Sequence, residues 1–194
     1  MVIATGNAGK YREIADLLEG TAHRIFSLKD FPSLEAPEET GTTFEENAVL
    51  KAEYYAKCLG VPCVADDSGL VVDALGGTPG VYSARYAGEN ATDAENNAKL
   101  LYSLRDVSDA GRTARFVCCA AWVGHSGALI TEIGLVEGHI AHVESGPNGF
   151  GYDPLFIPLG YRETFGVLDS SVKQTISHRA SAFRALRVRL LSPT

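Results

Sequence analysis

The sequence predicts an α/β fold, and three observations support this class. Helix-type and strand-type patterns follow one another along the chain, and two capping boxes, Thr43 with Glu46 and Thr92 with Glu95, each open a helix. An apolar run at residues 61–64 leads to paired carboxylates, as expected where a buried strand reaches the site-bearing edge of an open sheet. The chain has 194 residues, 45% of them hydrophobic, which suits one domain over residues 1–194.

The individual elements follow from periodicity and from breaker residues. A first strand is expected at residues 1–4 and a second at residues 23–27. The helix between them places Tyr11, Ile14, Leu17 and Leu18 on one apolar face. The expected remainder comprises helices over residues 44–59, over 93–104 and from 177 onward, and strands at residues 61–64, 70–72, 113–123, 128–136 and 137–143. A hairpin is expected to join the strands at 113–123 and 128–136.

Composition excludes several classes of function. The formal net charge is -7, which disfavours a duplex nucleic-acid binder or a membrane-surface protein. No secretory signal and no apolar run of membrane-spanning length is present, so we expect a cytoplasmic location. The four cysteines form no CxxC pair and are interpreted as reduced, small hydrophobic residues.

The stretch Asp66-Asp67-Ser68-Gly69 is the leading candidate for a catalytic centre. Side chains alternate across a strand, so Asp66 and Asp67 are predicted to point to opposite faces. We favour Asp67, beside the turn expected at Ser68-Gly69, because a carboxylate there can hold a divalent cation or take a proton from water. The same residues are also ordinary turn formers, so a solvated turn is the alternative for this stretch alone.

A glycine-bearing turn between the first strand and first helix is a candidate phosphate site. Glycines allow backbone N–H groups to approach an anion, the helix N-terminus favours negative charge, and a lysine adds a full charge. The turn matches neither GxxxxGK[ST] nor GxGxxG, so an ordinary strand-to-helix connection is the alternative. Its residues are Thr5, Gly6, Asn7, Ala8, Gly9 and Lys10.

Lys51 lies in the apolar stripe of the helix expected over residues 44–59. Phe44, Ala48, Lys51 and Tyr55 share nearly one face, because seven residues make almost two turns. Lysines in such positions usually extend their ammonium to solvent. The functional interpretation is a cation directed inward, beside Asp67.

Two later stretches suggest recognition of a nucleotide. Glycines and aromatic rings alternate in Phe150, Gly151, Tyr152 and Asp153, and an aromatic face can stack on a purine, although rings that fill the core are the alternative. His178 and Arg179, with Lys173 upstream, place cations in the first turn of the last helix. Cations there oppose the helix dipole unless an anion lies nearby, so a bound anion is one interpretation and incidental surface charge the other.

Together these residues predict a site for a magnesium nucleotide. Asp67 and one of Glu38 and Glu39 would supply acidic groups for the cation, and the turn at residues 5–10 would receive phosphates. Other chemistries fit worse, because a zinc deaminase needs PCxxC after HxE and a serine hydrolase needs GxSxG, and both are missing.

The ordered series of motifs resembles the inosine triphosphate pyrophosphatase family from the first strand to the last helix. The motifs include TGNAGK at residues 5–10, ADDSGL at 65–70, ALGG at 74–77, PGVYSAR at 79–85, FGYDP at 150–154 and SHR at 177–179. The resemblance implies a mixed, twisted central sheet flanked by helices, with two lobes around a cleft, and a homodimer. It also implies Mg²⁺-dependent hydrolysis of ITP, dITP and XTP to the monophosphate and pyrophosphate.

The resemblance also implies a role for each matching residue. Asp67 matches the catalytic acid–base and metal position, and Glu38 a second acidic metal position. Substrate contacts are implied for Thr5, Gly6, Asn7, Ala8, Gly9, Lys10, Lys51, Ser68, Phe150, Gly151, Tyr152, Asp153, Lys173, His178 and Arg179. Two alternatives stay open: a pyrophosphatase for other modified nucleotides, and a nucleotide-binding regulator without turnover.

Overall fold

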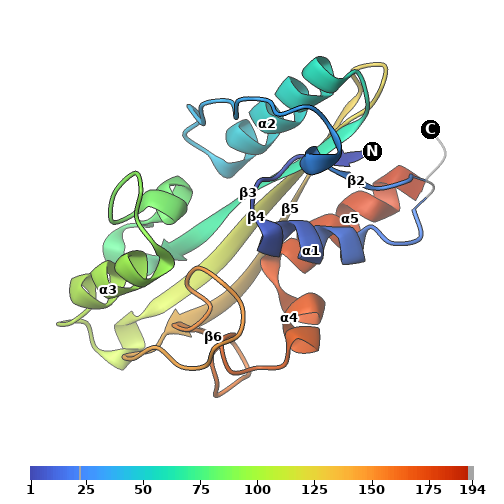
Figure 1. The fold of residues 1–194 in the computed structure, drawn as a ribbon. Helices are drawn as coiled ribbons and strands as arrows, with labels where there is room; N and C mark the ends of the chain where they lie inside the picture. Colours follow the sequence, from blue (N-terminus) through green and yellow to red (C-terminus); the bar gives the residue numbers. More distant parts are fainter. Residues whose placement is uncertain (22, 192–194) are drawn as a thin grey trace. The chain divides into compact units, whose positions relative to one another are not determined.

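A computed structural model describes residues 1–21 and 23–191 (Figure 1). Its centre is a mixed six-stranded sheet in the order β2-β1-β3-β4-β5-β6. Strand β1 pairs in parallel with β2 and β3, whereas β5 and β6 are antiparallel. The strands are β1 (Val2–Ile3), β2 (Phe26–Ser27), β3 (Cys63–Val72), β4 (Thr113–Val123), β5 (Leu129–Ile140) and β6 (Phe156–Pro158). The α/β class expected from the sequence is confirmed.

Five α-helices and four short 3₁₀ helices accompany the sheet in the described residues. The α-helices are α1 (Ala8–Leu17), α2 (Phe44–Leu59), α3 (Asp93–Ser103), α4 (Ser170–Ile176) and α5 (His178–Leu191). The 3₁₀ helices are η1 (Leu28–Asp30), η2 (Asp73–Leu75), η3 (Gly80–Arg85) and η4 (Asp109–Gly111). Within the described ranges, no helix combines the length and apolar character needed to cross a bilayer.

The chain forms two compact units. The first comprises residues 1–67, 118–134 and 178 onward, and the second comprises residues 68–117 and 135–177. The long strands β3, β4 and β5 each contribute residues to both units. Each unit has a hydrophobic core of its own.

In the first unit, strand alternation divides the core into two clusters. Ile3, Val64 and Cys118 lie in the cluster shared with α1 and α5. Their chain neighbours Val2, Cys63 and Cys119 lie in the cluster shared with α2. Helices α1 and α5 pack on each other, and α2 covers the opposite face of the sheet (Figure 1). Consecutive strand residues in this unit therefore pack against different helices, because successive side chains of a strand point to opposite faces of the sheet.

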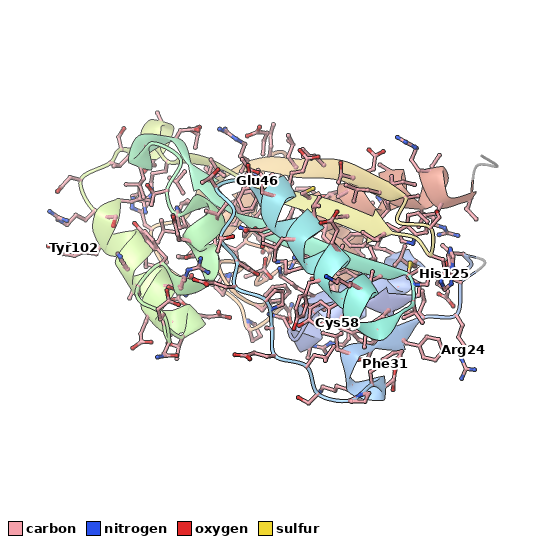
Figure 2. All side chains as sticks on the ribbon, turned by 90° about the horizontal axis from the view of Figure 1, so that it is seen from above. Arg24, Phe31, Glu46, Cys58, Tyr102 and His125 are labelled. Carbon is pink, nitrogen blue, oxygen red and sulfur yellow. The ribbon has the colours of Figure 1, made fainter. Side chains whose placement is uncertain are left out.

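Helix α2 has the boundaries predicted from its sequence. The Thr43 hydroxyl accepts the N–H of Glu46, and the Glu46 carboxylate accepts the N–H of Thr43, which completes the expected capping box. Gly60 ends the helix in the left-handed conformation, with φ 67°. Figure 2 shows the labelled Glu46 and Cys58 near the two ends of this helix. The capping box at Thr92 and Glu95 opens α3 in the same way.

The core of the second unit gathers aromatic rings beside α3. Phe156 packs against Phe116 and Phe165, with ring centroids 4.7 and 5.6 Å apart respectively. Leu100 and Leu104, at the C-terminal end of α3, pack in the same cluster. The folding of this unit therefore depends on segments far apart in sequence.

Two local expectations are wrong. β3 continues through Ser68 and Gly69, where a turn was expected, because its backbone is held within the sheet and the Leu70 N–H donates to the Ser83 hydroxyl at 2.9 Å. The strands expected at residues 128–136 and 137–143 are one strand, β5. As expected, Lys173 lies upstream of the last helix; it belongs to the short helix α4, which ends where the Ser177 backbone adopts an extended conformation.

Candidate active site

Asp66 and Asp67 point to opposite faces of β3, as strand alternation predicts. Asp66 lies on the face that carries Val64 and contacts residues of α1 and α5, whereas Asp67 lies on the face of α2. Both carboxylates are buried, with 3% and 6% of the respective residues exposed. A buried carboxylate requires charged or hydrogen-bonding partners, so each face must supply its own.

The partners of Asp67 come from α2. Lys51 Nζ lies 2.8 Å from Asp67 Oδ1, and the Asn47 amide donates to Asp67 Oδ2 at 3.4 Å. Asn47 and Lys51 are four residues apart, so one face of the helix presents both side chains. The inward orientation of Lys51 proposed from the sequence is the one observed.

The pKa values of this pair are set by burial and by charge together. Burial raises the pKa of Asp67 above its ordinary value, and the Lys51 ammonium offsets only part of that effect. Burial alone would lower the pKa of Lys51, but Asp67, Asp66 and Glu39 outweigh it and raise that pKa. The pair therefore combines a firmly protonated lysine with a carboxylate that is more basic than aspartate in water.

Glu39, rather than Glu38, reaches this group. Glu39 Oε1 lies 2.8 Å from Lys51 Nζ, so the ammonium bridges Glu39 and Asp67. Glu38 is exposed, which leaves the metal role suggested by the family resemblance without structural support. Asn47 also fixes the backbone that follows Glu39, because its amide oxygen accepts the Gly41 N–H at 2.8 Å.

The chemistry of Asp67 and Glu39 fits Mg²⁺ held partly by a substrate. Mg²⁺ prefers hard oxygen ligands and is commonly bound by one or two carboxylates together with substrate phosphates. Among residues 1–21 and 23–191, no group of three or more His, Cys, Asp or Glu side chains forms a complete metal site. Asp67 and Glu39 would supply two such carboxylates, and the phosphates of a bound substrate would supply further oxygen ligands.

Lys10 and Arg179 contact Asp66. Lys10 Nζ lies 3.2 Å and Arg179 Nη2 lies 3.1 Å from Asp66 Oδ2. Arg179 Nη1 also pairs with Glu13 Oε2 at 2.5 Å. Burial opposes the charge of Asp66, but Lys10 and Arg179 outweigh it and hold the pKa of Asp66 well below its ordinary value. The resemblance implies that Arg179 contacts the substrate, but its guanidinium pairs with two carboxylates and only 1% of the residue is exposed.

The turn before α1 uses some of its own hydrogen-bond donors. Asn7 caps the helix, because its Oδ1 accepts the N–H groups of Gly9 at 2.8 Å and Lys10 at 3.0 Å. A pocket of about 570 Å³ opens on the same turn and is lined by Thr5, Gly6, Asn7, Ala8, Tyr11, Arg12, Ser27, Lys29 and Asp30. Two cations that the sequence analysis did not select, Arg12 and Lys29, therefore accompany the candidate phosphate turn.

The aromatic-glycine loop forms a second group of polar residues, in the second unit. Asp153 Oδ2 accepts the Phe150 N–H at 2.8 Å and pairs with Lys173 Nζ at 2.5 Å. The same ammonium lies 4.4 Å from the centroid of the Phe150 ring. Lys173 is thus placed by Asp153 against an aromatic face, which is a favourable cation–π arrangement.

Tyr152 and His178 are more buried than the sequence interpretation assumed. Tyr152 packs in the core of the second unit, and its hydroxyl donates to the Ser83 carbonyl at 2.8 Å. His178 begins α5 and is 4% exposed. Gly134 allows this close packing, because a Cβ there would lie 2.2 Å from the His178 carbonyl oxygen. Ser68 is partly buried within β3.

Sequence reasoning missed Asn47 and Glu13 of the first unit, and it set Asp66 aside in favour of Asp67. Asn47 follows the capping box on the inner face of α2, so a buried amide one turn before Lys51 was the available signal. Glu13 lies three residues after Lys10 on α1, and both contact the Asp66–Arg179 group. Nothing in the sequence pairs Asp66 with Arg179, because these residues are 113 positions apart.

The mixed sheet and its helices define an α/β protein, and each of its two units carries one group of buried charged residues. The family model described as the Ham1 family matches residues 1–189. The chain belongs to the Ham1 family, which confirms the family resemblance found in the motifs.

Relatives and solved structures agree over nearly the whole chain. A protein of Geobacter sulfurreducens named dITP/XTP pyrophosphatase is 49% identical over 187 residues, 96% of this chain and 94% of that protein. One of Haemophilus influenzae with the same name is 47% identical and covers 98% of each chain. A HAM1 protein structure from Coxiella burnetii superposes with a TM-score of 0.88 at 42% identity, covering 97% of this chain and 96% of that one.

Proposed function

We propose that this protein is a hydrolase that cleaves dITP, ITP and XTP to the corresponding monophosphate and pyrophosphate. The observation that carries the proposal is Asp67, a buried carboxylate with a raised pKa that Lys51 and Asn47 hold in place. Relatives 49% and 47% identical to this chain are named dITP/XTP pyrophosphatases, which supports this substrate class.

Asp67 acts as the general base in the proposed reaction. A carboxylate that is more basic than aspartate in water removes a proton from an attacking water more readily. Asn47 and Lys51 fix the orientation of this carboxylate through contacts to its two different oxygens. The attack is on the α-phosphorus, and pyrophosphate departs.

Lys51 supplies positive charge where the phosphates carry negative charge. Its raised pKa keeps the ammonium protonated, so it stabilises charge that develops on the leaving group. Asp67 and Glu39 would hold Mg²⁺, which neutralises phosphate charge when bound. The pocket with Arg12 and Lys29 at the turn before α1 offers further cationic contacts for phosphate oxygens.

In this proposal the purine ring of the substrate binds against Phe150 and Lys173. The Phe150 ring offers a stacking face, and the Lys173 ammonium is a hydrogen-bond donor. A donor that hydrogen-bonds to the 6-oxo group of hypoxanthine or xanthine has no acceptor when adenine binds, because adenine carries an amino group at that position. An unsatisfied buried donor costs about 1–3 kcal/mol, enough to reject adenine by roughly tenfold or more.

Pyrophosphate release from dITP, ITP, XTP, dATP and dGTP, with and without magnesium, tests the proposal. We expect release from the first three substrates, and a decrease of orders of magnitude in Asp67→Asn without loss of folding. The matched control is Asp106→Asn, because Asp106 is an exposed aspartate whose ion pair with Arg105 lies at the surface. Near-normal turnover by Asp67→Asn would remove Asp67 from the mechanism, and tight ITP binding without release would favour a regulator.

The proposal also covers the domain organisation, the metal dependence, the assembly and the location of the protein. Both units are assigned to one nucleotide pyrophosphatase domain, because a single family model spans residues 1–189. Mg²⁺ dependence and a homodimeric assembly follow from the family resemblance, and the cytoplasmic location stays a prediction from the sequence. Cleavage of such triphosphates would remove them from the nucleotide pool.

A further inference from the structure

The backbone of Gly151 is held at both of its polar groups by one face of α3. Asp93 Oδ2 accepts the Gly151 N–H at 2.7 Å, and the Asn97 amide donates to the Gly151 carbonyl at 3.1 Å. Asp93 and Asn97 are four residues apart, so they lie one above the other on the helix surface. Gly151 adopts the left-handed conformation, with φ 61°, which a glycine accepts without strain.

These two contacts complete the support of Phe150. The N–H of Phe150 donates to Asp153, which also holds Lys173, and the next residue along the chain is tied to α3. The Phe150 ring thus extends from a segment fixed on both sides. A ring used for stacking gains affinity when its orientation is set before the ligand arrives, because binding then costs less ordering entropy.

We propose that Asp93 and Asn97 are positioning residues for recognition of the purine ring, acting through Gly151 on the Phe150 ring. The inference rests on the proposed function, in which Phe150 stacks on the base. Asp93 and Asn97 act on Gly151 and not on the reacting groups, so their loss is expected to raise KM for dITP and to leave kcat nearly unchanged.

Asn97 allows this role to be separated from a contribution to stability. Only 2% of the residue is exposed, and its Oδ1 has no hydrogen-bond partner within the part of the chain that the structure describes. Replacement of Asn97 by Leu removes that unsatisfied atom and keeps a similar volume, so the fold should lose little. The Gly151 carbonyl belongs to a partly exposed residue and can bond to water instead.

Asn96 provides the matched control, because it is a buried asparagine at the neighbouring position with a different task. Its side chain accepts the Ala87 N–H at 2.7 Å and donates to the Ala84 carbonyl at 3.1 Å. Asn96→Leu therefore removes one hydrogen bond to η3 and one to the segment that follows it, and it leaves the contacts of Gly151 in place. We expect it to lower the melting temperature without a specific rise in KM.

The experiment measures kcat, KM and melting temperature for wild type, Asn97→Leu, Asp93→Ala, Asp93→Asn and Asn96→Leu with dITP. Loss of one positioning hydrogen bond is expected to raise KM by about threefold to tenfold in Asn97→Leu and Asp93→Ala. Asp93→Asn retains an acceptor oxygen and should restore much of the affinity.

The possible outcomes separate the inference from the proposed function. Unchanged KM in Asn97→Leu and Asp93→Ala, with an active wild type, overturns the inference alone. An equal rise in KM in Asn96→Leu also overturns it, since general damage to α3 would then explain the effect. Wild-type protein that releases no pyrophosphate overturns the proposed function, and this inference with it.

Discussion

Asp66 and Asp67 are adjacent in β3 and pair with cations on opposite faces of the sheet. Asp66 Oδ2 lies 3.1 Å from Arg179 Nη2, whereas Asp67 Oδ1 lies 2.8 Å from Lys51 Nζ. The environments shift the two pKa values in opposite directions, downward for Asp66 and upward for Asp67. One carboxylate is thus fixed as a permanent anion within the fold, and its neighbour is left basic enough for proton transfer.

The first prediction concerns the acid limb of the pH–rate profile. The limb should reflect ionisation of Asp67, whose pKa burial raises and the Lys51 ammonium lowers. Lys51→Met removes the lowering influence, so the pKa of Asp67 rises further and the limb moves to higher pH. Lys51→Arg keeps the charge and should leave the limb near its original position. The measurement is kcat/KM against pH on the residual activity, and a limb that stays in place in Lys51→Met would argue against Asp67 as the base.

The second prediction concerns the ion pair of Asp66 and Arg179, whose side chains are each only 1% exposed. Arg179→Leu leaves Asp66 with fewer compensating charges in a buried position, which typically costs about 3–5 kcal/mol of unfolding free energy. Urea denaturation measures this loss. Arg189→Leu is the control, because Arg189 is 60% exposed in its pair with Glu132 and should change stability by less than about 1 kcal/mol.

The same ion pair makes the free energy of unfolding depend on pH in the acidic range. The folded-state pKa of Asp66 is lowered, so its stabilising contribution is present above the unfolded pKa of about 4 and is lost as pH falls toward the folded value. Arg179→Leu removes one of the charges that lower the pKa of Asp66. The free energy of unfolding should therefore fall less steeply with pH below about pH 4 in this variant. Parallel acid denaturation curves for wild type and variant would contradict this assignment.

The third prediction distinguishes the two neighbouring glutamates. Glu39 contacts Lys51 beside Asp67, and Glu38 is exposed. Glu39→Gln should therefore raise the Mg²⁺ concentration that gives half-maximal activity, while Glu38→Gln should match wild type. A magnesium titration at saturating dITP makes the comparison, and an effect confined to Glu38→Gln would support the metal role that the family resemblance implies for Glu38.

The fourth prediction concerns Gly149, where a side chain has no room. Its φ is 78°, and a Cβ would lie 2.1 Å from Asp153 Oδ2, the atom that pairs with Lys173. Gly149→Ala should displace Asp153 and raise KM for dITP as well as lower stability.

Gly160 is the control for the strain of the left-handed conformation alone. Its φ is 88°, and the space that a Cβ would occupy has no neighbouring atom within 4 Å. Gly160→Ala should cost about 1–2 kcal/mol of stability and leave KM unchanged. Equal KM values in the two variants would show that the contact of Gly149 with Asp153 has no part in substrate binding.

Local sequence signals determined much of the secondary structure. The capping boxes at Thr43 and Thr92 predicted the starts of α2 and α3, because the required side-chain and backbone partners lie within four residues. Strand alternation likewise predicted the opposite orientations of Asp66 and Asp67. The turn expected at Ser68-Gly69 failed because pairing within the sheet overrides the local preference of turn-forming residues.

The partners of the charged residues were decided by the tertiary structure. The sequence selected Asp67, Lys51, Lys10 and Arg179 by residue type, but it could not assign Lys10 and Arg179 to Asp66. That assignment depends on which helix covers which face of β3, and on contacts between residues more than 100 positions apart. Residue chemistry is local and can be read along the chain, whereas the electrostatic environment of a buried carboxylate arises only when distant segments pack around it.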